Sequence, residues 1–207
     1  MSAEATVLWG AAGHARVLRD ILGAERVEAV FDNAVVEPPW DVPLFVGREG
    51  FADWFGSGRA RTFAVAIGGG RGVDRLEIAA WLEHQGLSPL SVRHSRAIVE
   101  PSAELAPGVQ VLAGAFVGAS ARIGRMAILN SMSSIDHDCI VGEGCHIAPR
   151  AVLCGEVTVG PRCFVGAGAT ILPKLRLGAA VIVGAGATVT RDVPDGTTVI
   201  GTPARPI

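Results

Sequence analysis

From Val99 to Val189 a branched aliphatic residue stands at every sixth position. A helix would space its apolar residues by three and four, and a half-buried strand by two, so a strict period of six fits neither. The period predicts a coil of short parallel strands, in which each hexad forms one flat side and three sides close one turn. The inward positions are Val99, Leu105, Val111, Val117, Ile123, Leu129, Ile135, Val141, Ile147, Leu153, Val159, Val165, Ile171, Leu177, Val183 and Val189.

Two further registers support this coil. Small or modest residues stand two places before each inward position, where they would fill a corner, and glycine recurs one place after many of them, where we expect it to tolerate the turn backbone. The run predicts roughly five turns of a triangular β-helix. Beyond Val189 the repeat stops, and residues 191–207 are expected to cap the last turn, because an open end is an exposed sheet edge.

Residues 1–93 follow a different pattern. Apolar runs predict strands at 6–9, 27–31 and 62–67, and helical spacing predicts helices at 15–22 and 73–85. This order is typical of a small Rossmann-like parallel sheet. Proline and glycine indicate surface loops near residues 38–40 and 56–58, and residues 88–95 are expected to be the connector. The chain is therefore predicted to be an α/β domain over 1–93, followed by a β-helix over 94–207.

Candidate ligand loops follow the predicted strands, at the edge where parallel sheets bind ligands. The turn from Gly10 to His14 can bring backbone N–H groups and a helix start to a phosphate, and Asp32 can accept from a ribose or a base. A third loop holds Gly68, Gly69 and Gly70. The first turn lacks the complete G-x-G-x-x-G fingerprint, so an ordinary tight turn explains it equally well.

Composition narrows the partners. The 207 residues are 49% hydrophobic with a net charge of −2, which gives no electrostatic case for nucleic acid or a membrane surface. No stretch approaches the ~18 apolar residues of a membrane span. We therefore expect a cytoplasmic protein whose partners are small molecules and its own copies. The cysteines agree: Cys139, Cys145 and Cys163 fall in the small inward register, and a Cys145–Cys163 bridge is unnecessary in a reducing compartment.

The coil contains two histidines, His137 and His146. His137 lies two residues past an inward position, so its ring faces outward between Asp136 and Asp138. Neighbouring carboxylates hold an imidazole in one tautomer and raise its basicity, which suits a general base. A solvated surface triplet explains the same residues equally well. We expect no metal, because a third coil histidine is missing and no cysteine pair has zinc-ligand spacing.

The segment from Asn130 to Gly155 resembles the sialic-acid O-acetyltransferase-like family of hexapeptide-repeat sugar acetyltransferases. It is most similar to bacterial members that N-acetylate nucleotide-linked 4-amino sugars, of the UDP-bacillosamine-pathway and GDP-perosamine types. The resemblance spans nearly the whole chain, at residues 10–14, 31–33, 66–68, 94, 130–139 and 201–204. It implies a left-handed β-helix and an acetyl-CoA-dependent N-acetyltransferase of surface glycan biosynthesis.

The resemblance also implies roles for residues. His137 matches the general base and Asp138 the carboxylate beside it. The acetyl-CoA positions are His146, Gly155, Ala167, Ala185 and Asn130. The nucleotide-sugar positions are Ala12, Gly13, His14, Asp32, Asn33 and Gly68. The family works as a homotrimer with active sites between subunits. We expect direct attack in a ternary complex, since no covalent nucleophile is evident.

Two departures leave alternatives open. Aspartate replaces the glutamate that some relatives have beside the base, and Asp136 precedes it, so either carboxylate can orient His137. The same machinery would serve a hydroxyl, which makes a sugar O-acetyltransferase the first alternative. A non-catalytic nucleotide-sugar-binding scaffold is the second. A dinucleotide-dependent oxidoreductase, favoured only by the glycine turn and Asp32, is the third.

Overall fold

The computed structural model describes residues 5–34 and 37–207. The chain forms two compact units, one of residues 1–68 and 77–92 and the other of residues 69–76 and 93–207. The division is therefore not a single cut near residue 93. A short segment after the third predicted strand belongs with the coil.

The first unit is built on a parallel five-stranded sheet with the order β3-β2-β1-β4-β5. Its strands are β1 Thr6–Trp9, β2 Val27–Asp32, β3 Leu44–Val46, β4 Thr62–Val65 and β5 Ser88–Pro89. Its helices are α1 Gly13–Leu22, the 3₁₀ helix η1 Ala24–Arg26, α2 Gly47–Phe55 and the second half of α3 Gly72–His84. The three predicted strands and both predicted helices are confirmed, with α1 beginning two residues before the expected Ala15.

Two elements of this unit escaped the sequence pattern. Strand β3 has only three residues, none of them buried, and α2 carries Gly47 and Gly50 in its first turn, which weakens a helical signal. Packing stabilises α2 instead, because it buries Phe51 and Trp54 among the aromatic rings of the core. The expected connector was also wrong at its start: Ser88–Pro89 is an edge strand, where a proline is tolerated.

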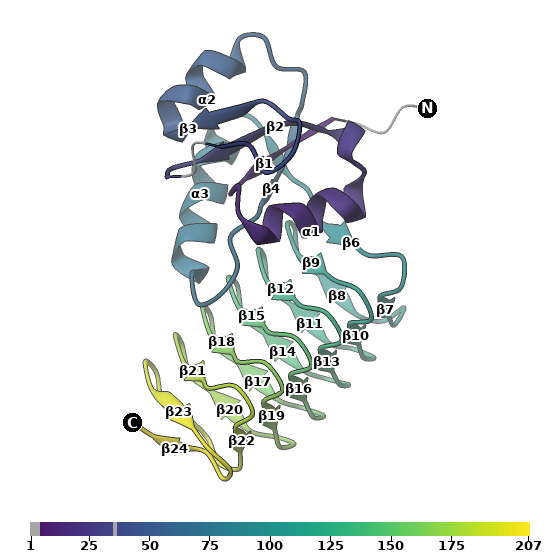
Figure 1. The fold of residues 1–207 in the computed structure, drawn as a ribbon. Coiled ribbons are helices and arrows are strands. Elements are labelled where there is room, and N and C mark those ends of the chain that lie inside the picture. The colour runs from purple at the N-terminus through teal and green to yellow at the C-terminus, as the bar shows by residue number, and fades with distance from the viewer. Residues whose placement is uncertain (1–4, 35–36) are drawn as a thin grey trace. The chain divides into compact units, whose positions relative to one another are not determined.

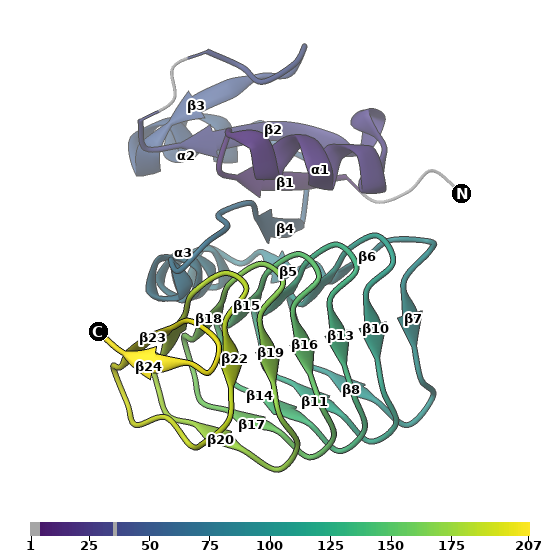
Figure 2. The ribbon, with the colours of Figure 1, turned by 60° about the horizontal axis from the view of Figure 1, so that its bottom comes forward.

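The second unit is a parallel β-helix with three flat faces (Figures 1 and 2). One sheet has the order β22-β19-β16-β13-β10-β7, the next β20-β17-β14-β11-β8, and the third β24-β23-β21-β18-β15-β12-β9-β6. Strands one turn apart pair in parallel with a shift of 18 residues, as Phe116 pairs with Ser134.

The strands of this coil, in chain order, are β6 Val92–Arg93, β7 Ile98–Val99, β8 Glu104–Leu105, β9 Gln110–Val111, β10 Phe116–Val117, β11 Arg122–Ile123, β12 Ile128–Leu129, β13 Ser134–Ile135, β14 Ile140–Val141, β15 His146–Ile147, β16 Val152–Leu153, β17 Thr158–Val159, β18 Phe164–Val165, β19 Thr170–Ile171, β20 Arg176–Leu177, β21 Ile182–Val183, β22 Thr188–Val189, β23 Thr198–Ile200 and β24 Arg205–Pro206.

The inward register is confirmed as the core of the coil. Every member from Val111 to Val189 is buried, and only the first two, Val99 and Leu105, are partly exposed. Glycine after an inward residue has a different cause from the one expected. A Cβ on Gly124 would lie 2.5 Å from the backbone nitrogen of Glu143 on the next turn. The turn positions with positive φ come two residues later, as at Met126 with φ of 55°.

Both ends of the coil differ from the expectation. Strand β6 joins the third sheet, so the coil begins before Val99. At the other end Val193 bridges to Leu177, and β23 pairs in parallel with β21, so the coil continues past Val189 although the six-residue period does not. Only β24, antiparallel to β23, turns back as a cap. The final turn does not keep the six-residue spacing, so the sequence period did not predict it.

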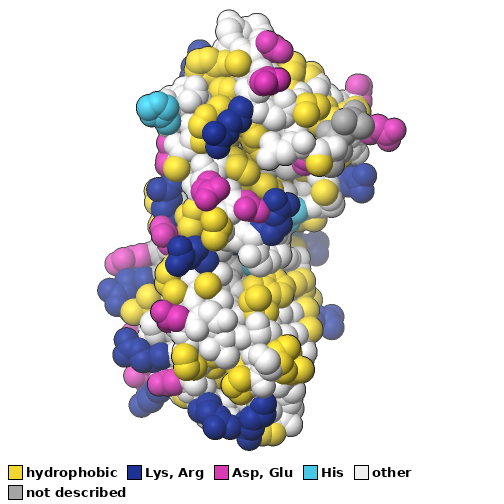
Figure 3. All heavy atoms as spheres, turned by 90° about the vertical axis from the view of Figure 1, so that its left-hand side faces the viewer, with side chains coloured by type: hydrophobic (Ala, Val, Ile, Leu, Met, Phe, Trp, Pro, Cys, Tyr) yellow, Lys and Arg dark blue, Asp and Glu magenta, His cyan; other side chains and the backbone are white. Residues whose placement is uncertain are grey.

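The cysteines are free thiols, and Cys139, Cys145 and Cys163 are buried as core residues. The thiols of Cys145 and Cys163 donate to carbonyls of the following turn, at Gly160 and Gly178. No helix in residues 5–34 and 37–207 is long and apolar enough to cross a membrane. Acidic and basic side chains are interspersed on the face drawn in Figure 3, as the small net charge leads one to expect.

Candidate active site

His137 lies in the turn between β13 and β14, at the corner of the coil that we call the His137 corner: the turns joining the β7–β22 sheet to the β8–β20 sheet. Its side chain is 53% exposed, as the sequence predicts for an outward ring. Nδ1 lies 2.8 Å from Oδ2 of Asp138, whose own backbone has a φ of 56°. The backbone N–H of His137 donates to Asp136 at 2.7 Å. Asp138 therefore orients the ring, whereas Asp136 fixes the main chain.

This geometry sets the protonation chemistry of the ring. The pKa of His137 is raised, chiefly by the hydrogen bond to Asp138. Desolvation is the next effect and lowers this pKa, whereas the charges of Asp136, Asp138 and Glu156 raise it. A proton on Nδ1 directed at a carboxylate leaves Nε2 as the acceptor of the neutral ring. The imidazole is thus a stronger base than usual, with its lone pair on the nitrogen remote from Asp138.

Gly155 lies one turn further along the same corner, against this nitrogen. A Cβ on Gly155 would stand 2.5 Å from Nε2 and 2.8 Å from Cε1 of His137. The neighbouring backbone is paired within the coil: Cys154 N–H donates to Ile171 and Glu156 N–H donates to His137. The absence of a side chain at residue 155 thus leaves room for the ring and for an atom beside Nε2.

The other coil residues of the expected site lie elsewhere. His146, in β15, is only 5% exposed. Its Nδ1 accepts from the backbone N–H of Gly69 at 2.7 Å, its Nε2 lies 3.0 Å from Nδ2 of Asn130, and Phe164 meets the ring edge-on. The contact with Gly69 was not predicted, since no sequence pattern relates residues 77 positions apart.

Asn130 belongs to a second corner, formed by the turns that join the β6–β24 sheet to the β7–β22 sheet, and we call it the Asn130 corner. Ala167 and Ala185 stand exposed on later turns of this corner, and Gly186 N–H donates to the carbonyl of Ala167. The structure thus gathers the expected coil residues into two groups on different corners: His137, Asp138 and Gly155 on one, and Asn130, His146, Ala167 and Ala185 at or beside the other.

The nucleotide-site candidates lie on loops after adjacent strands of the first unit. Strand β1 lies between β2 and β4, so the chain reverses its direction of winding there, and such switch points bind ligands. Asp32 Oδ2 accepts the backbone N–H of Ala11 at 2.8 Å, which ties the loop after β2 to the loop after β1. Ala12 and Gly13 are exposed at the start of α1. His14 is the second residue of α1, Asn33 directly follows β2, and Gly68 lies in the loop after β4.

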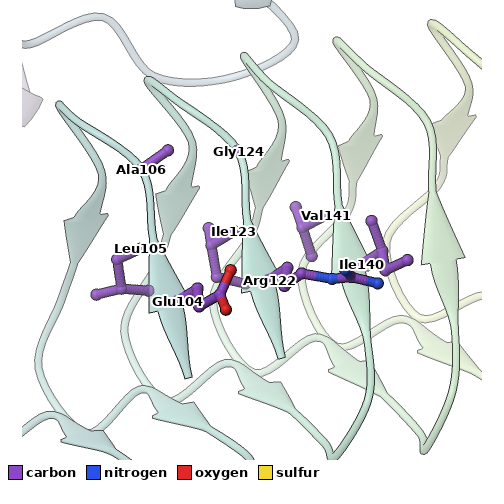
Figure 4. A pocket seen from close by; sticks show the side chains of 8 residues that line it. All are labelled: Glu104, Leu105, Ala106, Arg122, Ile123, Gly124, Ile140 and Val141. Carbon is purple, nitrogen blue, oxygen red and sulfur yellow. The ribbon is translucent and has the colours of Figure 1, made fainter. Parts of the chain in front are cut away.

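Two hollows lie near the His137 corner. One of about 370 Å³ is lined along β8, β11 and β14, where Glu104, Arg122 and Ile140 follow one another (Figure 4). It contains none of the expected site residues. Another of about 270 Å³ joins Glu104 and Arg122 to Ser102, Ser120 and Asp138. Asp138, the carboxylate beside His137, therefore borders an open polar hollow. Within the described residues, no group of three or more His, Cys, Asp or Glu side chains is placed to hold a metal ion.

Comparison with known proteins extends this description. No known family profile and no curated protein matches the chain. Among solved structures, a histidine variant of perosamine N-acetyltransferase from Caulobacter crescentus, in complex with CoA and GDP-perosamine, is 35% identical. The alignment covers 100% of this chain and 98% of that one, with a TM-score of 0.93.

Two further structures match over their full length. The acetyltransferase domain of PglB from Neisseria gonorrhoeae, in complex with acetyl coenzyme A, is 27% identical, covers 100% of both chains and has a TM-score of 0.88. WeeI from Acinetobacter baumannii is 26% identical, covers 99% of this chain and 100% of that one, and has a TM-score of 0.86. The fold is accordingly a left-handed β-helix behind a Rossmann-like domain, and the chain belongs to the family of hexapeptide-repeat sugar N-acetyltransferases.

Proposed function

We propose that the protein transfers the acetyl group of acetyl-CoA to the amino group of a nucleotide-linked 4-amino deoxysugar. The observation that carries the proposal is an exposed imidazole that Asp138 orients through Nδ1. It stands in a chain that aligns with 98% of the length of an enzyme bound to CoA and GDP-perosamine. Free thiols suit a reducing cytoplasm, where we place the reaction. Nucleotide-linked sugars of this kind serve surface glycan biosynthesis.

The reaction is a direct attack within a ternary complex. The sugar amine attacks the thioester carbonyl carbon, the C–S bond breaks, and CoA leaves as a thiol. Nε2 of His137 takes the proton that the amine loses and can return it to the departing sulfur. Cys139 is no candidate nucleophile, because its side chain is buried and burial raises the pKa of its thiol to about 11.

The position of Gly155 supports a role in stabilising the tetrahedral intermediate. Its backbone lies beside Nε2 of His137, and the N–H groups on either side of it are committed to the coil. We assign the N–H of Gly155 to the oxyanion, because a backbone donor fixed by two adjacent hydrogen bonds needs no rearrangement when charge develops. The nucleotide sugar is assigned to Ala12, Gly13, His14, Asp32, Asn33 and Gly68, with phosphate at the start of α1.

We predict that the protein is a homotrimer. The base and Gly155 lie on one corner of the coil, and the other expected acetyl-CoA residues lie at or beside another. A single chain therefore presents two half-sites, and a cyclic assembly brings the half-sites of adjacent copies together. Sedimentation equilibrium at micromolar concentration should give three times the 21.3 kDa of the chain. The mass of one chain, in a preparation that is fully active, would contradict the shared site.

Asp32→Ala should raise KM for the sugar nucleotide at least tenfold and leave KM for acetyl-CoA nearly unchanged. The carboxylate accepts the N–H groups of Ala11 and Ala34, so its loss releases the two loops that carry the proposed nucleotide site. Steady-state kinetics with each substrate varied in turn measures the difference. Asp20→Ala, an exposed carboxylate of α1 paired with Arg19, is the matched control. Equal changes in both KM values would argue against separate substrate sites.

Asp138→Asn should move the acidic limb of the kcat/KM profile to lower pH. The base works when unprotonated, and Asp138 raises the pKa of His137, so activity in the wild type is lost on acidification earlier than with an ordinary imidazole. Asparagine keeps an oxygen near Nδ1 but removes the charge. Asp136→Asn should move the limb less, because Asp136 bonds the main chain. A limb that stays in place in both variants would exclude His137 as the titrating group.

The function is tested by mass spectrometry of acetyl transfer to a panel of UDP-, GDP- and dTDP-linked 4-amino sugars. The panel includes a sialic acid and a 4-hydroxy sugar nucleotide, which report O-acetylation. We expect a product heavier by one acetyl group with at least one amino sugar and none with its hydroxyl counterpart. Binding of sugar nucleotides without any product supports a scaffold, and thermal stabilisation by NAD without any product supports the oxidoreductase alternative.

A further inference from the structure

Arg75 is a fully buried arginine, in the first turn of α3, that the reaction described above does not use. It belongs to the segment of residues 69–76, which forms one unit with the coil. Burial lowers the pKa of Arg75 to about 10, so the guanidinium stays charged at neutral pH. A charged group is retained in such an interior only where its N–H groups find strong acceptors.

The acceptors of Arg75 are backbone carbonyls from both sides of one contact. On the coil, Nη2 donates to Gly144 at 2.5 Å and to Cys145 at 3.2 Å, and Nε donates to Met126 at 3.2 Å. On its own segment, Nη1 donates to Gly69 at 3.3 Å. One planar guanidinium therefore joins the residue at the start of the segment to two adjacent turns of the coil.

Close packing reinforces this attachment. A Cβ on Gly72 would stand 2.3 Å from the carbonyl oxygen of Gly144, and one on Gly144 would stand 2.9 Å from Leu76. The start of α3 can therefore approach the coil this closely only because both positions are glycine. Gly69 is thus held on both sides: its carbonyl oxygen accepts from Arg75, and its N–H donates to Nδ1 of His146.

The bond from Gly69 defines the chemistry of His146. A ring nitrogen that accepts an N–H carries no proton, so a neutral His146 has its proton on Nε2, the nitrogen that faces Asn130. A backbone N–H can only donate, whereas the amide of Asn130, whose Oδ1 accepts from the N–H of Ser131 at 2.7 Å, can present either its nitrogen or its oxygen to Nε2. Gly69, and not Asn130, thus sets the tautomer and orientation of the ring.

We propose that Arg75 is a positioning residue of the acetyltransferase: by holding Gly69 on the coil, it fixes His146 for acetyl-CoA. The inference rests on the proposed function for the role of His146. Arg75→Lys keeps the charge but removes the planar set of N–H donors of the guanidinium. It should therefore impair binding of acetyl-CoA rather than the proton transfer at His137.

The test compares four variants in the full chain. Arg75→Lys should raise KM for acetyl-CoA about tenfold, with the pH profile of kcat unchanged, and in a His146→Ala background the same substitution should change this KM less than twofold, because the two residues act through one contact. The matched control is Arg71→Met, an arginine of the same segment whose side chain is 65% exposed. A tenfold change in both backgrounds, or none in either, overturns the proposal.

Two measurements keep this outcome separate from that of the proposed function. Hydrogen exchange at the amide of Gly69 needs no turnover, and it should quicken at least tenfold in Arg75→Lys while amides of β13 and β16 stay protected. Calorimetric titration of acetyl-CoA into the wild type tests the function itself. If acetyl-CoA does not bind the wild type, the proposed function fails, and unchanged exchange at Gly69 overturns the role of Arg75 whether or not acetyl-CoA binds.

Discussion

His137→Ala lowers kcat by at least ~10², the effect expected when a positioned general base is removed. In free energy this corresponds to roughly 3 kcal/mol or more of lost transition-state stabilisation. Both KM values and the melting temperature should stay close to those of the wild type, because the side chain is 53% exposed and contributes little to the packing of the coil. Steady-state kinetics under saturating substrates measures the loss.

The control for this variant is His84→Ala, an exposed histidine at the end of α3 that should retain full activity. Asp138→Ala should lose less than His137→Ala, because Asp138 orients and polarises the ring but takes no proton from the substrate. If His137→Ala kept more than about a third of the wild-type kcat, the base would have to be another group. The Asp136-His137-Asp138 sequence would then be a solvated surface triplet.

Gly155→Ala lowers kcat at least tenfold although it adds a single methyl group. The new Cβ would stand 2.5 Å from Nε2 of His137, well inside contact distance, so one of the two must move. The ring is the free end of an exposed side chain and moves more easily than the coil backbone, so the loss should fall on catalysis and not on stability. Thermal unfolding and kinetics of the same preparation separate the two effects.

Two comparisons sharpen the Gly155 prediction. Gly56→Ala places its methyl group where no atom lies within 4 Å and should be neutral. In a His137→Ala background Gly155→Ala should cost far less than alone, because the clash needs the ring. Full additivity of the two losses would mean that Gly155 acts independently of His137, through acetyl-CoA or the oxyanion.

The coil could be predicted from the sequence because one residue in six faces its narrow interior, and this requirement recurs in every turn. The outward direction of His137 followed from the same register. The period does not show contacts between turns. The close approach that requires a glycine at residue 124, and the position of Gly155 against the His137 ring, depend on residues 18 or 19 apart. The final turn was missed because Val193 and Val199 are buried outside the strict spacing.

The attachment of residues 69–76 to the coil escaped prediction for another reason. Arg75 is one of several charged residues of α3, and its acceptors include backbone carbonyls, which no sequence pattern identifies. The sequence likewise does not show that Gly69, Asn130 and Phe164 surround His146. Residue types indicated which groups could do chemistry. The tautomers of these groups, and the residues that hold the groups in place, depend on tertiary contacts.

The most direct test of the account is the stoichiometry of transfer. Release of the CoA thiol and formation of the N-acetylated sugar nucleotide are followed in one reaction, with a thiol reagent and with mass spectrometry, in the presence and absence of a GDP-linked 4-amino sugar. Direct attack predicts that thiol and product appear in equal amounts and that thiol release stops when the acceptor is omitted. Thiol release at the same rate without acceptor, or an acceptor recovered unchanged across the panel of amino sugars, would contradict the account.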